Sequence, residues 1–178
     1  MRINLPNGLT IARILMVPLM VIAFYLPFRG TNLIAAAMFT IAAITDWLDG
    51  YLARRYQQTS DFGAFLDPVA DKLAVTVALF LIVQADKTAL MAVTAAIIVG
   101  REITISALRE WMAAIGERTK VGVAWLGKVK TVVQMIAIII LLMQHRYVGK
   151  PLYWFGKALL IAAAALTIWS AVVYLRAA

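Results

Sequence analysis

The sequence lacks cysteine and carries little charge. None of its 178 residues is a cysteine and only one is a histidine, which excludes disulfide frameworks and thiolate–metal chemistry. Charged residues make up 15% of the chain, against about 25% in average soluble domains. Acidic residues are fewer than basic residues, with nine Asp and Glu against 17 Lys and Arg. Such a chain is neither a disordered segment nor an ordinary cytosolic enzyme.

Hydrophobic residues, in contrast, make up 63% of the chain, more than a soluble domain of this length can bury. They fall into six runs: 11–28, 33–47, 69–83, 89–105, 132–143 and 152–174. A membrane helix needs about 20 residues, so the fifth run must begin earlier, near Val123 or Trp125. We therefore predict an all-α membrane protein, one domain over residues 1–178 built as a bundle of six transmembrane helices. The first run is expected to be a retained span, because no cleavage motif follows it.

The positive charges predict the orientation in the membrane. If the N-terminus is cytoplasmic, 12 of the 17 Lys and Arg residues fall on the cytoplasmic side of the six spans, and five fall on the other. Cytoplasmic loops carry the excess of Lys and Arg, so both termini are predicted to be cytoplasmic. The surplus is thus a topology signal, and no nucleic-acid partner is expected. Lys157, inside the sixth run, is expected to extend its ammonium outward to the polar boundary.

Four carboxylates are predicted to meet at one place. Asp46 and Asp49 are three positions apart at the end of the second run, and Asp67 and Asp71 are four apart at the start of the third. Each pair therefore shares one helix face. A ten-residue connection over 54–63 would let the two helices run antiparallel with these faces opposed. Asp61, out of phase with both pairs, is expected to be a solvated loop residue.

Ionised carboxylates near the hydrocarbon need a compensating cation. Oxygen ligands without His or Cys favour a hard ion such as Mg²⁺ or Mn²⁺, and four carboxylates suffice for two ions that share ligands. Two such ions can clamp the oxygens of a phosphoryl group in transfer. The alternative is that the aspartates cap helix ends or pair with Arg54 and Arg55. This alternative explains a single aspartate well, but it explains four carboxylates on two facing helices less well than a metal site does.

The segment as a whole carries a recognisable signature. It reads Asp46-x-x-Asp49-Gly50-x-x-Ala53-Arg54, then eight residues, Gly63, three residues, Asp67, three residues and Asp71. This pattern is similar, at every fixed position, to the signature of the CDP-alcohol phosphatidyltransferase family. Three further blocks resemble the branch of the family whose acceptor is sn-glycerol 3-phosphate: Asn7-x-x-Thr10-x-x-Arg13, Arg101-Glu102 to Ser106-x-Leu108-Arg109-Glu110, and Gly127-Lys128-x-Lys130-Thr131-x-x-Gln134.

The resemblance implies transfer of a phosphatidyl group from CDP-diacylglycerol to sn-glycerol 3-phosphate with release of CMP, in phosphatidylglycerol and cardiolipin synthesis. It implies a homodimer in the bacterial inner membrane, with the active site on the cytoplasmic side and in contact with membrane lipids. Asp71 would be the general base. The metal ligands would be Asp46, Asp49, Asp67 and Asp71, and the residues that bind the CDP group would be Asp49, Gly50, Ala53, Arg54 and Gly63.

A second phosphate, on the acceptor, requires a second basic site. The candidates are cations near the fourth and fifth runs on the same predicted side, namely Arg101, Arg109 and Lys128, with Lys130 beside them. Arg101 lies within an apolar stretch, where an arginine indicates function or a buried partner such as Glu102. Arg13 is expected to anchor the first span rather than to reach the nucleotide.

Two other functions remain open from the sequence. The same chemistry could use another acceptor, such as serine, inositol phosphate or phosphatidylglycerol. A small cation carrier could use the carboxylates as a transport site, but it gives no reason for the spacing of Gly50, Ala53, Arg54 and Gly63.

Overall fold

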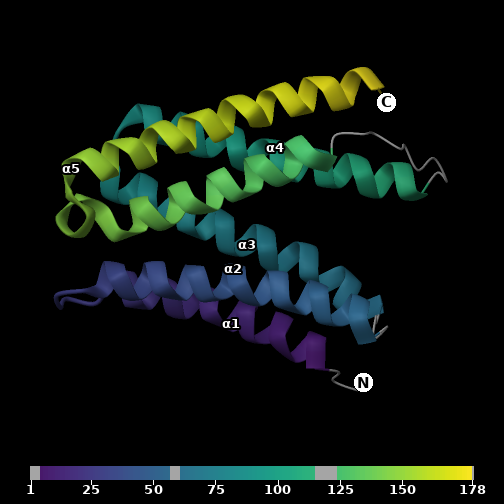
Figure 1. Ribbon diagram of the computed structural model, residues 1–178, viewed down its shortest axis with the longest axis horizontal. Helices are drawn as coiled ribbons and strands as arrows, with labels where there is room; N and C mark the ends of the chain where they lie inside the picture. Colours follow the sequence, from purple (N-terminus) through teal and green to yellow (C-terminus); the bar gives the residue numbers. More distant parts are fainter. Residues whose placement is uncertain (1–4, 57–60, 115–123, 178) are drawn as a thin grey trace.

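The computed structural model describes residues 5–56, 61–114 and 124–177, and within these ranges it contains helices and no strands (Figure 1). The described part of the signature segment lies in two of these helices. The helices are α1 (Leu5–Tyr25), α2 (Thr31–Tyr56), α3 (Asp61–Asp86), α4 (Ala89–Ala114) and α5 (Ala124–Ala177).

The last helix is bent back on itself. Gln144 (φ 60°) and Gly149 (φ 78°) leave the helical conformation, and they divide α5 into two arms, 124–143 and 150–177. Pro151 lies in the first turn of the second arm, where its missing N–H costs no helical hydrogen bond. The fold therefore has six helical rods, and the prediction of an all-α bundle of six helices is confirmed. The fifth rod begins at Ala124, as the length argument required.

Successive rods run in opposite directions along the bundle (Figure 1). α1, α2 and α3 form one half, and α4 with the two arms of α5 forms the other. α1 begins and α5 ends at the same end of the molecule. The connection between α1 and α2 and the bend of α5 both lie at the opposite end.

Small residues allow the rods to approach closely. Ala35, Ala36, Ala78 and Ala137 are fully buried between helices, whereas large hydrophobic side chains such as Trp169 are exposed on the outside. This distribution is typical of helices that pack in a membrane and face lipid. Among the described residues, three helical stretches are long and apolar enough to cross a membrane: Gly8–Tyr25, Ala89–Met112 and Arg146–Ala171. Two shorter helical stretches are also apolar, Thr31–Asp46 and Val129–Gln144.

The two arms of α5 touch most tightly at Gly156. A Cβ atom added there would lie 2.8 Å from Cγ2 of Ile140 in the other arm. That distance is shorter than a van der Waals contact, so only glycine fits without displacement of the neighbouring arm.

The helices around the signature are longer than the sequence suggested. α2 continues to Tyr56 and α3 begins at Asp61, so the predicted connection over 54–63 is too long. Asp61 is the first residue of α3, which corrects its assignment to a loop. An aspartate at the first position of a helix is stabilised by the free N–H groups and the helix dipole, and this signal explains the early start.

Candidate active site

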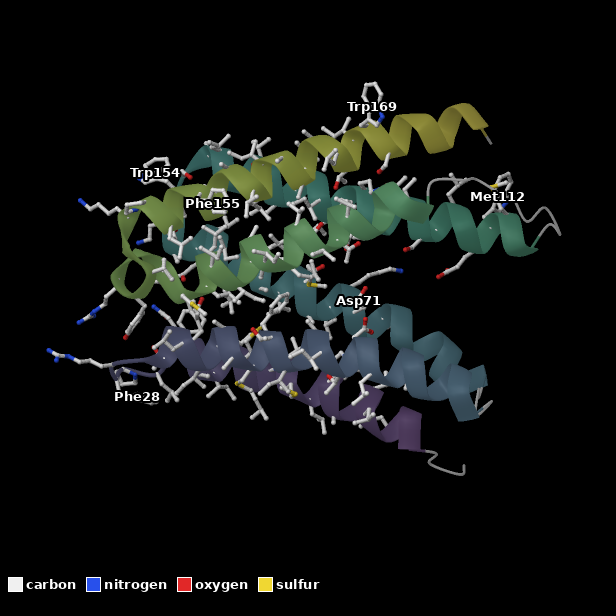
Figure 2. The ribbon with its side chains drawn as sticks, in the orientation of Figure 1. Phe28, Asp71, Met112, Trp154, Phe155 and Trp169 are labelled. Carbon is white, nitrogen blue, oxygen red and sulfur yellow. The ribbon has the colours of Figure 1, made fainter. Side chains whose placement is uncertain are left out.

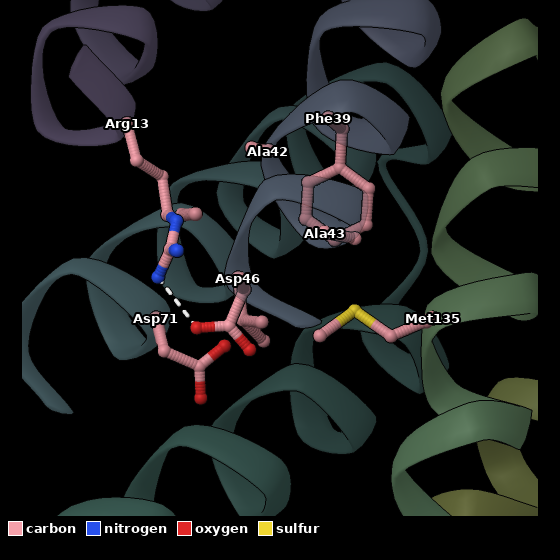
Figure 3. A pocket seen from close by; sticks show the side chains of 9 residues that line it. Arg13, Phe39, Ala42, Ala43, Asp46, Asp71 and Met135 are labelled. Atoms are coloured by element: carbon pink, nitrogen blue, oxygen red, sulfur yellow. Dashed lines mark hydrogen bonds and ion pairs between the residues drawn. The ribbon is translucent and has the colours of Figure 1, made fainter. Parts of the chain in front are cut away.

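The site is built around two carboxylates that α2 and α3 bring together. Asp46 lies on α2 and Asp71 on α3, and their side chains lie beside each other and line the same small cavity (Figure 3). Because antiparallel helices place the end of one against the start of the next, the spacing in the sequence is enough to produce this meeting. Two of the four carboxylates predicted to meet therefore lie together, and the side chains of the other two, Asp49 and Asp67, lie outside the described residues.

An arginine from α1 completes the group. Nη1 of Arg13 lies 2.5 Å from Oδ1 of Asp46, and the arginine side chain is only 1% exposed. Figure 3 shows the guanidinium entering the site from the opposite side to Met135. A buried guanidinium without a carboxylate would be strongly destabilising, so the ion pair fixes both partners. Arg13 is therefore part of the site, and its assignment to anchoring alone was wrong.

The cavity among these side chains is small. Its volume is about 10 Å³, and apolar side chains such as Phe39, Ala42 and Val75 form most of its wall. That volume is close to the minimum that one water molecule requires. A space of this size is far smaller than a nucleotide.

A second charged group from α4 and α5 borders the first. Nζ of Lys130 lies 3.5 Å from Oε1 of Glu102, and the residue is only 3% exposed. Arg101 donates a hydrogen bond from Nη2 to Oγ of Ser170 at 3.1 Å. Glu102 acts electrostatically on Asp71 as well as on Lys130. Glu102 therefore couples the charged group of α4 and α5 to Asp71 on α3.

Among the candidates for the acceptor phosphate, Arg101 and Lys130 both belong to the charged group of α4 and α5, in which Lys130 pairs with Glu102. The side chains of Arg109 and Lys128 lie outside the described residues. Gln134, one turn beyond Lys130, is only 2% exposed, and its Oε1 has no hydrogen-bond partner among the described residues. A buried amide oxygen of this kind is satisfied when a hydroxyl donates to it.

The remaining predicted site residues belong to helical backbone whose side chains lie outside the described set. They are Asp49, Gly50, Ala53 and Arg54 on α2 and Gly63 and Asp67 on α3. Their roles as ligands of metal ions or of the CDP group stay predictions. Within the part of the chain whose side chains are described, no three His, Asp, Glu or Cys residues form a group that could hold a metal ion.

A different ion pair lies at the opposite end of the bundle. Nζ of Lys157 lies 2.6 Å from Oδ2 of Asp86, and the same carboxylate accepts hydrogen bonds from Tyr153 at 2.8 Å and from Thr88. The expectation that Lys157 extends outward was wrong, because Asp86 offers a buried partner. Burial alone would raise the pKa of Asp86, but the hydrogen bonds from its three donors outweigh burial and hold that pKa below its usual value.

Comparison with known proteins agrees with this geometry. The model of the CDP-alcohol phosphatidyltransferase family matches residues 3–169. The CDP-diacylglycerol–glycerol-3-phosphate 3-phosphatidyltransferase of Sodalis glossinidius (strain morsitans) is 50% identical over 178 residues, which cover 100% of this chain and 96% of the relative. The proteins of the same name from Haemophilus influenzae and Escherichia coli (strain K12) are 51% and 47% identical, again over 100% of this chain and over 95% and 96% of their own lengths.

The helical bundle and its paired carboxylates are those of a membrane-embedded transferase. The match to the family model and the full-length similarity to named relatives show which family of transferases this is. The chain belongs to the CDP-alcohol phosphatidyltransferase family.

Proposed function

We propose that this chain transfers a phosphatidyl group from CDP-diacylglycerol to sn-glycerol 3-phosphate, giving phosphatidylglycerophosphate and CMP. The observation that carries the proposal is the meeting of Asp46 and Asp71 in one cavity, with Glu102, the ion-pair partner of Lys130, close enough to act electrostatically on Asp71. The reaction needs a place for a diphosphate donor next to a place for a phosphorylated acceptor, and these two groups supply them. Relatives that are 47–51% identical over the whole chain carry the name of this reaction.

The donor side fits a pair of Mg²⁺ or Mn²⁺ ions. The donor set is made of carboxylate oxygens, and Asp46 and Asp71 already share one cavity. Asp49 and Asp67 would supply the other ligands. When bound, divalent ions neutralise the donor diphosphate and the charge that gathers on the departing CMP. Because the cavity is far smaller than a nucleotide, the CDP group would lie outside it, along the face that carries Gly50, Ala53, Arg54 and Gly63.

Asp71 is proposed as the general base. In the reaction a bond forms between an acceptor hydroxyl oxygen and the phosphatidyl phosphorus, while the bond from that phosphorus to the CMP oxygen breaks. The hydroxyl proton passes to the Asp71 carboxylate, and the electron pair of the broken bond leaves with CMP. Arg13 holds Asp46 at 2.5 Å and so keeps the neighbouring carboxylate in place for this step.

The acceptor phosphate is proposed to bind Arg101 and Lys130, with Arg109 and Lys128 as further cations. Arg101 and Lys130 come from different helices and lie close enough to influence each other electrostatically. Two neighbouring cations repel, so a dianionic phosphate between them would be favourable. The buried Oε1 of Gln134 would accept a hydrogen bond from a glycerol hydroxyl.

We further infer that the protein lies in the bacterial inner membrane, with both termini and the site on the cytoplasmic side, as a homodimer. The asymmetric distribution of Lys and Arg supports the orientation. The dimer rests on the resemblance to the family.

The decisive experiment is an acceptor competition with the purified full-length chain. CMP release would be measured with CDP-diacylglycerol and Mg²⁺ in detergent micelles, with sn-glycerol 3-phosphate, serine, inositol phosphate or phosphatidylglycerol as the sole acceptor. We expect CMP release when sn-glycerol 3-phosphate is the acceptor and no release with the other three. Release driven by one of the other acceptors, but not by sn-glycerol 3-phosphate, would contradict the proposal.

A further inference from the structure

A second polar pocket lies at the end of the bundle opposite the carboxylates. Its volume is about 340 Å³, which falls in the usual range of ligand sites. It is formed where the connection between α1 and α2 meets the bend of α5. The lining residues are Leu26, Pro27, Phe28, Arg29, Thr31, Asn32, Gln144, Arg146 and Tyr147. Figure 2 places Phe28 at this end and Asp71 toward the other.

The pocket has a defined wall. The backbone N–H of Gly30 donates a hydrogen bond to Oη of Tyr147 at 2.6 Å, which joins the two chain segments across 117 positions. Gly30 (φ 95°), Gln144 (φ 60°) and Gly149 (φ 78°) all adopt left-handed backbone conformations around the pocket. Such conformations cost free energy for a residue other than glycine, so the shape of the two turns is specified rather than incidental.

The charge of the pocket is positive and uncompensated. Arg29 and Arg146 both line it, and neither has a carboxylate partner among the described residues. Asp86, the carboxylate at this end within the described helices, is occupied by Lys157. Two guanidinium groups beside the amide groups of Asn32 and Gln144 make a set of donors suited to a phosphate.

One side of the pocket is apolar. Leu26, Pro27 and Phe28 line it, and Leu26 and Phe28 are exposed large hydrophobic residues of a membrane-embedded bundle. A free phosphate makes no favourable contact with such an apolar wall. A phospholipid makes one, because its phosphate continues into a glycerol backbone and acyl chains that lie against apolar surface.

We propose that this pocket binds the phosphate headgroup of an anionic phospholipid from the leaflet opposite the catalytic site. Arg29 and Arg146 hold the phosphate, and Leu26 and Phe28 contact the upper part of the acyl chains. The bound lipid bridges the turn between α1 and α2 to the bend of α5, and so stabilises the contact between the two halves of the bundle. The site is separate from the catalytic carboxylates and does not depend on the reaction proposed above.

The test uses the purified full-length chain in mild detergent with added lipid. Retention of phosphatidylglycerol would be measured by native mass spectrometry, and the thermal unfolding midpoint would be followed in parallel. Arg29→Gln/Arg146→Gln removes both pocket cations. The matched control, Lys87→Gln/Lys150→Gln, removes two exposed lysines that do not line the pocket. Single Arg29→Gln and Arg146→Gln variants serve if the double variant does not fold.

We expect phosphatidylglycerol to raise the unfolding midpoint of the wild-type and the lysine control, and phosphatidylcholine to raise it much less. In the arginine double variant, binding should weaken about tenfold or more, because two charge-assisted contacts are lost. Turnover of the variant should be unchanged. An equal response to phosphatidylcholine, or an equal loss in the lysine control, would overturn the proposal. Stabilisation by inorganic phosphate as large as that by the lipid would overturn the assignment to a lipid.

Discussion

The two ends of the bundle treat charge in opposite ways. At the catalytic end, buried cations are matched to carboxylates, as in Arg13 with Asp46 and Lys130 with Glu102. At the opposite end, Asp86 is held by Lys157, whereas the arginines of the second pocket have no carboxylate partner among the described residues. Within the described part of the chain, the two ends therefore differ in whether their arginines are paired with carboxylates.

This difference separates reactivity from anchoring. A balanced cluster of charges can hold two carboxylates beside each other at a membrane boundary, where either alone would be costly. A site for phosphate transfer needs such carboxylates. At the opposite end, the proposed role is contact with anionic lipid headgroups, and arginines without a described carboxylate partner are sufficient for that contact. Substitutions at the two ends should therefore have different kinds of effect.

The largest effect should come from Asp71→Asn. An amide cannot accept the acceptor proton, so turnover should fall by about 10²–10⁴-fold, the range over which a general base contributes. Binding of CDP-diacylglycerol should fall much less than turnover, because the other proposed metal ligands, Asp46, Asp49 and Asp67, remain. The measurement is steady-state CMP release together with donor binding. Asp86→Asn, which removes a carboxylate at the other end, is the matched control and should keep turnover; normal turnover of Asp71→Asn would show that another group is the base.

The next effect should come from Arg13→Gln. Loss of the guanidinium leaves Asp46 without its partner, and activity should fall about 10–100-fold, as it does when a group that orients catalytic ligands is removed. The free energy of unfolding should also fall by about 1–3 kcal/mol, less than for a fully buried pair because Asp46 is 42% exposed. Turnover and thermal unfolding would be measured on the same preparation. Arg13→Lys should recover part of both losses, and a variant with no loss of activity would place Arg13 outside the site.

A smaller and more selective effect is expected from Lys130→Met. The KM for sn-glycerol 3-phosphate should rise about tenfold, because one charge-assisted contact to the acceptor phosphate is lost. The KM for the donor should not change. Lys150→Met, at the opposite end, is the control. Equal increases in KM for donor and acceptor would show that Lys130 acts through the fold and not through the acceptor.

The smallest effect should come from Asp86→Asn, and it should appear in stability alone. Since the pKa of Asp86 is lowered in the folded protein, its ionised form stabilises the fold above the unfolded pKa of about 4, and this contribution is lost as the pH falls through the folded value. At neutral pH the variant should be less stable by about 1–2 kcal/mol. Unfolding midpoints of both proteins should converge below about pH 4. A difference independent of pH would contradict the proposed role of the ionised carboxylate.

The sequence was sufficient for the helices and for half of the site. Long apolar runs in a chain with few acids can only form membrane helices, and pairs of aspartates three or four positions apart must share a helix face. The meeting of Asp46 and Asp71 follows from these two facts. The ends of α2 and α3 did not follow, because a polar segment of this kind reads as a loop until the packing of the helices is known.

The partners of single charges were harder to predict. Arg13 lies in an apolar run as Arg101 does, so the same signal, an arginine among apolar residues, is present at both positions. Lys130 and Lys128 differ by two positions, so only the packed bundle shows that Lys130 lies beside Glu102. Lys157 finds Asp86 across 71 positions, a distance that no local pattern reveals.

The origin of the charged groups has a consequence for specificity. Asp46 and Asp71 belong to α2 and α3, whereas Arg101 and Lys130 belong to α4 and α5. In the proposed mechanism, the groups on the donor side and the groups that bind the acceptor phosphate therefore lie on different helices. Exchange of α4 and α5 between relatives with different acceptors would test whether the choice of alcohol follows these two helices.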